Sequence, residues 1–78
     1  MNKYFFTFGS DERFPYTRND YVVVYAPTAH IAGKKFQKRH PNRPGSPFIN
    51  CSDIYSEENW NKFCDKYYHG AQPVEVIT

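Results

Sequence analysis

The sequence predicts a small α+β fold of one domain, residues 1–78, in which about four strands form a mainly antiparallel sheet and two helices lie on one face of it. Three observations lead to this class. A chain of 78 residues has the size of one domain. Two β-rich segments come before any helical pattern, and two amphipathic helical segments then alternate with two further β-rich segments. The predicted order is therefore strand, strand, helix, strand, helix, strand.

β-Branched and aromatic residues predict the first two strands. Residues 3–8, KYFFTF, are apolar on both faces, so we expect an inner strand that is covered from both sides or joined to a partner chain. Gly9 ends this segment, and residues 10–20, SDERFPYTRND, have no helical period and are expected to form a loop or arm. Residues 21–26, YVVVYA, are the clearest strand pattern in the chain, and Pro27 ends it.

The first helix is predicted from Ala29 to about His40. Thr28 is the expected N-cap, because its hydroxyl can accept a hydrogen bond from a free amide of the first turn. Pro41 ends the helix, and the segment HPNRPGSP that begins at His40 keeps the chain in turns. Apolar and small residues at three- and four-residue steps predict the buried stripe of this helix: Ala29, Ala32, Gly33, Phe36 and His40.

The second half of the chain predicts a strand, a helix and a short last strand. Residues 48–55, FINCSDIY, are β-rich, and Ser56 is the expected N-cap of the helix that follows. Gly70 is a candidate for its C-cap, and residues 74–77, VEVI, predict the last strand. The helix carries Glu57 and Glu58 in its first turn. Apolar residues at positions i, i+3, i+4 and i+7 predict its buried face: Trp60, Phe63, Cys64 and Tyr67.

Charge is distributed unevenly along the chain, although the formal net charge is only +2. Half of the ten Lys and Arg residues lie between positions 34 and 43, and no Asp or Glu lies between positions 21 and 52. The residues after position 52 carry more acidic than basic side chains, so we expect a basic centre and an acidic end. The basic patch consists of Lys34, Lys35, Lys38, Arg39, His40 and Arg43.

Two interpretations of the basic patch remain open. Arginine beside a rigid proline turn suits phosphate, because the planar guanidinium can donate two parallel hydrogen bonds. The patch could therefore bind phosphate or an acidic protein surface. The alternative is a solvated helix face whose cations are favoured by the helix dipole.

The predicted arm contains an alternation of cations and rings. Arginines beside aromatic rings fit a surface on which nucleobases stack while the cations hold phosphates. The alternative, which we favour, is that Phe14 and Tyr16 attach a long loop to the core, because Asp11, Glu12 and Asp20 neutralise the arm. The candidate binding residues of the arm are Arg13, Phe14, Tyr16 and Arg18.

Motifs of catalysis and metal binding are missing from the sequence. Cys51, Cys64, His40 and His69 are metal-binding residue types, but their spacing does not match a zinc motif. No nucleophile motif or glycine-rich phosphate loop occurs, so we expect neither an enzyme nor a cofactor. The sequence has no run of apolar residues long enough for a membrane span and no signal-peptide pattern, so we expect a cytoplasmic protein with reduced thiols.

The segments NKYFFTFGSDERFPY, DYVVVYAPTAHIAGKKF and HPNRPGSPFINCSDIYSEENW resemble small uncharacterised proteins carried by phages and mobile elements of Firmicutes, over residues 2–68. The resemblance implies no catalytic or binding residue. It does imply a class of activity, because small phage proteins often inhibit bacterial defence, as anti-CRISPR proteins or as sponges for a nucleotide signal. Many anti-CRISPR proteins are acidic DNA mimics, whereas this chain is basic at its centre, so we expect simple DNA mimicry only if the acidic end supplies the decoy surface.

We therefore expect a non-enzymatic inhibitor that binds a bacterial defence effector, or its nucleic acid, through a basic and aromatic surface in the host cytosol. A second hypothesis is an oligomeric sponge, in which a homodimer or larger assembly encloses a nucleotide between aromatic rings and Arg39 or Arg43. A third hypothesis is an accessory module for protein interaction, with a solvated basic helix. Seven Phe, seven Tyr and one Trp are more rings than a core of this size needs, so we expect some of them at a surface, as a dimer contact or a ligand platform.

Overall fold

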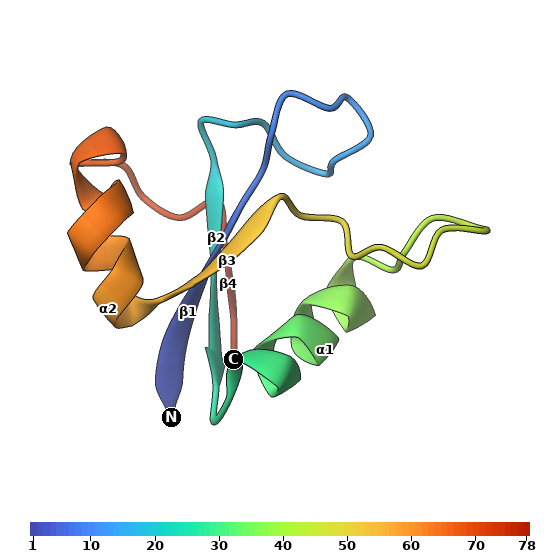
Figure 1. The fold of residues 1–78 in the computed structure, drawn as a ribbon, viewed down its shortest axis with the longest axis horizontal. Coiled ribbons are helices and arrows are strands. Elements are labelled where there is room, and N and C mark those ends of the chain that lie inside the picture. The colour runs from blue at the N-terminus through green and yellow to red at the C-terminus, as the bar shows by residue number, and fades with distance from the viewer.

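Four strands form one sheet in the order β3-β1-β2-β4, and two helical segments pack on it (Figure 1). The computed structural model describes all 78 residues. The chain order is the predicted one, and the structure confirms the α+β class. The elements are β1 (Asn2–Thr7), β2 (Tyr21–Ala26), α1 (Ala29–Arg39), β3 (Asp53–Ser56), the short helix α2 (Glu57–Asn59), the π-helix η1 (Trp60–Cys64), the 3₁₀-helix η2 (Asp65–Tyr67) and β4 (Glu75–Ile77).

The sheet is mainly antiparallel, as predicted, but one of its edges is parallel. The central strand β1 pairs antiparallel with β2, from Asn2↔Ala26 to Thr7↔Tyr21, and antiparallel with β3. β4 pairs parallel with β2, which makes the sheet mixed. β1 and β2 are therefore the inner strands, and β3 and β4 are the two edges.

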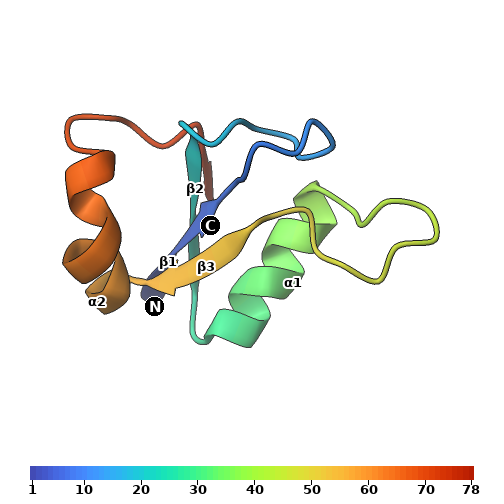
Figure 2. The same cartoon turned by 45° about the horizontal axis from the view of Figure 1, so that its top comes forward.

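The two helical segments lie on opposite faces of the sheet, and the prediction that both lie on one face was wrong (Figures 1 and 2). Successive side chains of a strand point to opposite faces. Phe6 stacks on Phe36 of α1, whereas the neighbouring Phe5 stacks on Trp60 of the second helical segment. The physical reason lies in β1 and β2, which are apolar on both faces and therefore need cover on both.

The core on the α1 face is the larger one. Phe6, Val22, Val24 and Phe36 are fully buried there. α1 begins as predicted, since the Thr28 hydroxyl accepts a hydrogen bond from the Ile31 amide (3.2 Å). Within the predicted stripe of α1, Ala32 and Phe36 are buried, Gly33 and His40 are half-buried, and Ala29 is exposed.

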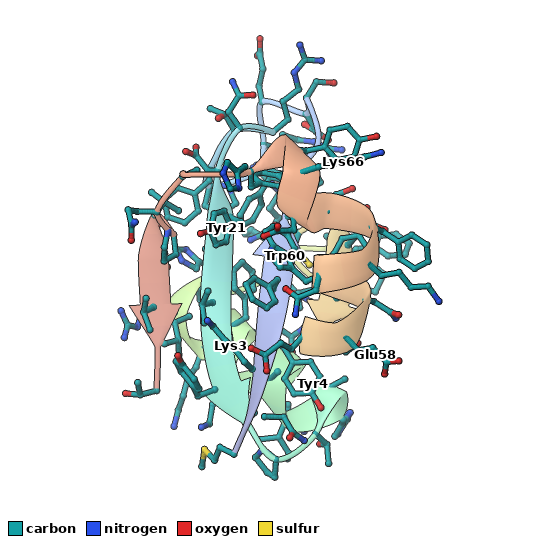
Figure 3. All side chains as sticks on the ribbon, turned by 90° about the vertical axis from the view of Figure 1, so that its left-hand side faces the viewer. Lys3, Tyr4, Tyr21, Glu58, Trp60 and Lys66 are labelled. Atoms are coloured by element: carbon teal, nitrogen blue, oxygen red, sulfur yellow. The ribbon has the colours of Figure 1, made fainter.

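The second helical segment, residues 57–67, begins at the predicted cap, where the Ser56 hydroxyl accepts from the Asn59 amide (3.2 Å). Its buried face differs from the predicted one. Trp60 and Cys64 are buried, but Phe63 is 55% exposed and Tyr67 is 73% exposed. The cause is the π-helical turn, which bonds i to i+5 and so widens the turn. The inward positions become Trp60, Cys64 and Tyr68, four residues apart, and Figure 3 shows Trp60 beside Tyr21 of the sheet.

The predicted strand over residues 48–55 is confirmed only in its last part, since β3 begins at Asp53. Residues 48–52 leave the sheet and belong to an irregular loop that also contains three prolines. This segment returns to the sheet at Ser52, whose backbone amide donates a hydrogen bond to the Thr7 carbonyl (2.8 Å). Phe48 is 75% exposed as a result. The structure contains no helix with the length and apolar character that a bilayer crossing requires.

Candidate anion-binding cleft

Two loops far apart in the sequence line an open cleft of about 600 Å³. We call residues 10–20 the arm and residues 41–52 the proline loop. A cleft of this volume falls within the range of small-molecule sites, about 300–1,000 Å³. Its lining includes Asp11, Arg13, Phe14, Arg43, Phe48 and Cys51.

Arg13 and Asp11 form the polar wall that the arm contributes. Nη2 of Arg13 donates to Oδ2 of Asp11 (2.9 Å), and Nε lies 3.2 Å from both carboxylate oxygens. The backbone amide of Arg13 also donates to Oδ1 of Asp11 (2.9 Å). A guanidinium has five N–H donors, so the Nη1 group of Arg13 still has free donors after this pairing. Arg13 is thus held in a defined position with hydrogen-bonding capacity left.

The pKa of Asp11 provides a test of this geometry. The side-chain hydrogen bond from Arg13, followed by the backbone hydrogen bond from Arg13, lowers the pKa of Asp11 from 3.8 to about 2. Because the folded pKa lies below the ordinary one, the contribution to stability is present above pH 3.8 and is lost as the pH falls through about 2. We expect the Asp11 carboxyl signal in an NMR titration to have its midpoint near 2, and to move toward 3.8 in R13Q but not in K34Q. An ordinary midpoint in the wild type would contradict the Arg13 to Asp11 contact.

Arg43 is the cation that the proline loop contributes. Its side chain is half-buried and makes no hydrogen bond or ion pair within the chain. The backbone around it is ordered by a turn, in which the Ser46 amide donates to the Arg43 carbonyl (2.9 Å) and Gly45 takes φ +80°. The base of the loop is closed by Asn50, whose side-chain amide donates to the Pro41 carbonyl (2.6 Å). The loop therefore contributes an unpaired guanidinium to the cleft that Arg13 also lines.

Two phenylalanine rings belong to the same cleft. Phe14 is half-buried and packs against Phe8 of the core, with 6.2 Å between the ring centroids. This contact attaches the arm to the core, as the favoured interpretation predicted. Phe48, which the proline loop contributes to the lining, has no such role, since three quarters of its surface is exposed. An exposed ring beside two guanidinium groups can stack on a flat ligand.

Half of the predicted basic patch is used within the protein. Nζ of Lys35 donates to the Tyr25 carbonyl (2.7 Å) and lies 3.4 Å from the Thr78 carbonyl, so it ties α1 to β2 and β4. Nη1 of Arg39 donates to Oε2 of Glu75 (2.9 Å), and Nε2 of His40 lies 2.7 Å from Oε1 of the same carboxylate. These three side chains serve the fold.

Glu75 is the residue on which the arm, α1 and β4 converge. Besides Arg39 and His40 it accepts a hydrogen bond from the hydroxyl of Tyr16 (3.1 Å), whose ring packs against Phe8 and His40. Burial first, and then the charge of Glu75, raises the pKa of Tyr16. Tyr16 therefore holds the arm against the sheet and does not face the cleft, which again agrees with the favoured interpretation of the arm.

Loss of Glu75 should destabilise the protein measurably. In E75A we expect the free energy of unfolding to fall by about 2 kcal/mol, because a hydrogen bond to a charged group contributes about 1.5–3 kcal/mol and the exposed part of the Arg39 pair contributes little. The matched control is E12A, which removes an exposed carboxylate that forms no hydrogen bond or ion pair and should change stability by less than about 0.5 kcal/mol. Urea unfolding monitored by Trp60 fluorescence measures both. If E75A and E12A have the same free energy of unfolding, the Glu75 contacts contribute nothing to stability.

The remaining predicted site residues lie outside the cleft. Lys34 and Lys38 are exposed on α1 and have no partner, so the solvated helix face describes them well. Arg18 lies at a second groove with Tyr55, Phe63, Tyr67, Tyr68 and His69, and its carbonyl accepts from the Tyr68 hydroxyl (3.1 Å). The structure thus brings together Arg13, Phe14 and Arg43, and separates them from the rest.

Sequence reasoning missed Phe48 and Glu75. Phe48 was assigned to a strand, although the prolines and glycine just before it are a signal that a regular element has not yet begun. Glu75 was taken as one residue of an alternating strand. The sequence contained little indication of its role, because only the fold shows that Glu75 contacts Arg39 and His40 in the part of the chain that lacks acidic residues.

The two cysteines are free and buried on opposite faces of the sheet. Burial, and then the charge of Asp53, raises the pKa of Cys51 to about 12. The thiol of Cys51 therefore stays protonated near neutral pH, and the thiol is not the nucleophilic form. Although Cys51 lines the cleft, it contributes a small apolar surface there.

No known protein family, curated protein or solved structure shows significant similarity to the chain.

Proposed function

We propose that the protein is a non-catalytic binding protein whose cleft holds a phosphate group, and that it inhibits a bacterial defence effector by binding the effector or its nucleic acid. One observation carries the proposal. Arg13 and Arg43, from separate loops, line the same cleft, and both guanidinium groups have free donors. Planar guanidinium groups are well suited to the bidentate recognition of phosphate.

The composition of the cleft supports a nucleic acid as the phosphate source. Phe48 is exposed beside the two arginines, so a base can stack on it while its phosphate lies between the cations. Base stacking on an aromatic side chain contributes about 1–3 kcal/mol. Lys34 and Lys38 on α1 add positive potential that steers an anionic strand toward the protein without forming a specific contact.

The non-catalytic part of the proposal is supported by the chemistry of the cleft. The cleft is lined by one thiol, Cys51, and two hydroxyls, Ser46 and Ser52, and by no histidine that could act as their base. Burial raises the pKa of Cys51 to about 12. His40 lies against Glu75 and packs on Phe36, outside the lining of the cleft. The defence context rests on the sequence resemblance of residues 2–68 alone, since the comparisons with known proteins add nothing to it.

A nucleotide sponge is the second candidate. The cleft volume of about 600 Å³ favours it, because a space of that size suits a mononucleotide or a small cyclic oligonucleotide. In this case Arg13 and Arg43 bind the phosphate, whereas the prediction from the sequence was Arg39 or Arg43, and Arg39 is paired with Glu75.

Binding measurements distinguish the candidates. A fluorescently labelled single-stranded oligonucleotide should bind with an affinity that falls steeply with salt, and a panel of cyclic oligonucleotides should raise the melting temperature only if the sponge is correct. At a ligand concentration of one hundred times Kd, the added stability should be about 2.7 kcal/mol. Purified defence effectors, with and without their guide RNA, are then tested for retention on the immobilised protein. If neither phosphate ligands nor effectors bind at low salt, the proposed function is wrong.

A further inference from the structure

The outer edge of β3 is an open sheet edge. β3 pairs with β1 only, because it is the first strand in the order β3-β1-β2-β4. The outward backbone groups of such a strand can pair with another chain. Many proteins block their edges with Lys, Pro or a bulge. The four residues of β3, DIYS, contain neither Lys nor Pro, and their register with β1 is continuous.

Exposed apolar side chains lie beside this edge. Phe63 and Tyr67 project from the second helical segment, and Ile54 of β3 is 38% exposed. Phe63 lines a groove of about 620 Å³ together with Tyr55 of β3, so the rings and the edge belong to one surface. Ile54 pairs with Phe6 and therefore lies on the α1 face, so we restrict the name edge strip to Phe63 and Tyr67. Aromatic rings of this kind are enriched in protein interfaces.

The second helical segment lies over the β3 side of the sheet, and β4 lies at the far side (Figure 3). If two copies pair through β3 in the antiparallel sense, a twofold axis perpendicular to the sheet relates them. The second helical segments then lie on the same face and run antiparallel across the axis. The rings of the edge strip, which are exposed in one copy, would then be covered by the other.

We propose that the edge strip and β3 bind a second copy of the chain, so that two four-stranded sheets join into one continuous sheet. This inference does not depend on the proposed function, because the anion-binding cleft is lined by other residues.

Charge on the second helical segment identifies the partner as a second copy. Glu57 and Glu58 lie at its start, and Lys62, Asp65 and Lys66 lie toward its end, which leaves that end with a net charge of +1. All five are exposed, and none forms an ion pair within the chain. In an antiparallel pair the acidic start of one segment faces the basic end of the other. Twofold symmetry makes this contact occur twice, which is the self-complementarity that an isologous interface needs.

The mass in solution tests the proposal first. Light scattering after size exclusion should give twice the chain mass of 9.2 kDa, with dissociation only on dilution. F63E places a charge in the strip and should raise the dimer Kd by at least about tenfold. V76E is the matched control, because Val76 is 48% exposed on the opposite edge strand β4, and it should leave the dimer intact. A wild type that stays at the chain mass at all concentrations, or dissociation by V76E and not by F63E, would overturn the proposal.

A charge exchange tests the relative orientation. E57K/E58K and K62E/K66E each place like charges across the interface, so each alone should shift toward monomer. An equimolar mixture should form a heterodimer, because opposite charges face each other again at both contacts. Far-UV circular dichroism checks that both variants are folded. Adding F63E to both should abolish the heterodimer. If the mixture does not associate, or if it associates regardless of F63E, the proposed interface is wrong.

Discussion

The double variant R13Q/R43Q should bind a single-stranded oligonucleotide about 100-fold more weakly than the wild type at low salt. Each guanidinium of the cleft has free donors for a phosphate, and a charge-assisted hydrogen bond contributes about 1.5–3 kcal/mol. We assign about tenfold to each arginine, the lower end of that range, because Arg13 also holds Asp11. The salt dependence should also become shallower, by about 0.7 in the log-log slope for each phosphate contact that is lost.

The matched control for this variant is K34Q/K38Q, which removes the same charge from the exposed face of α1. If the cleft is the binding site, this control should lose less than about threefold in affinity, through weaker steering alone. F48A adds a separate test of stacking and should cost about 1–3 kcal/mol if a base lies on that ring. Equal losses in the two double variants would show that the overall positive potential binds the ligand and that the cleft does not.

The second large effect concerns stability. W60A should lower the free energy of unfolding by about 3–5 kcal/mol, the usual cost of truncating a buried aromatic side chain. Trp60 is 4% exposed, stacks on Phe5 with 4.3 Å between centroids and contacts three tyrosines. A domain of this size has a total stability of only several kcal/mol, so a large fraction of the variant should be unfolded at room temperature.

F63A is the informative comparison for W60A. The sequence spacing places both residues on one buried face, whereas the π-helical turn leaves Phe63 more than half exposed. F63A should therefore cost about 1 kcal/mol or less. Urea unfolding monitored by far-UV circular dichroism suits both variants, since W60A lacks the fluorophore, and a low protein concentration avoids any contribution from self-association. Comparable losses in the two variants would contradict the π-helical register.

The order of the elements and their caps could be predicted from the sequence because these depend on neighbouring residues. Thr28 and Ser56 cap helices in the structure as their positions indicated. The sequence did not show which face of the sheet each helix covers. Residues 3–8 are apolar on both faces, however, and this pattern already indicated that both faces are buried. The burial of the second helical segment was wrong in part because the spacing rule assumes 3.6 residues per turn, and the wide turn at Trp60 breaks that rule.

The candidate site shows a similar limit. The sequence marked Arg13, Phe14 and Arg43 as candidates, but their meeting in one cleft depends on the fold. It also included Lys35, Arg39 and His40, which bind backbone carbonyls or Glu75. Positive charge along a sequence does not distinguish a cation that is free from one that is paired with a distant carboxylate. The distinction becomes visible only in the fold, where the pairing of β4 with β2 brings Glu75 to Arg39 and His40.

The parallel pairing of β2 with β4 brings together residues that are far apart in the sequence, such as Val22 and Glu75. The strands β1 and β2, by contrast, are close in sequence, because little more than the arm lies between them. Contacts between distant positions have a larger loop-closure cost and form slowly. We therefore expect the hairpin and α1 to assemble early and β4 to dock last. Until that step the free side of β2 can recruit other chains, so weakening β4 should lower the yield of refolding at high concentration more than it changes the refolding of dilute protein.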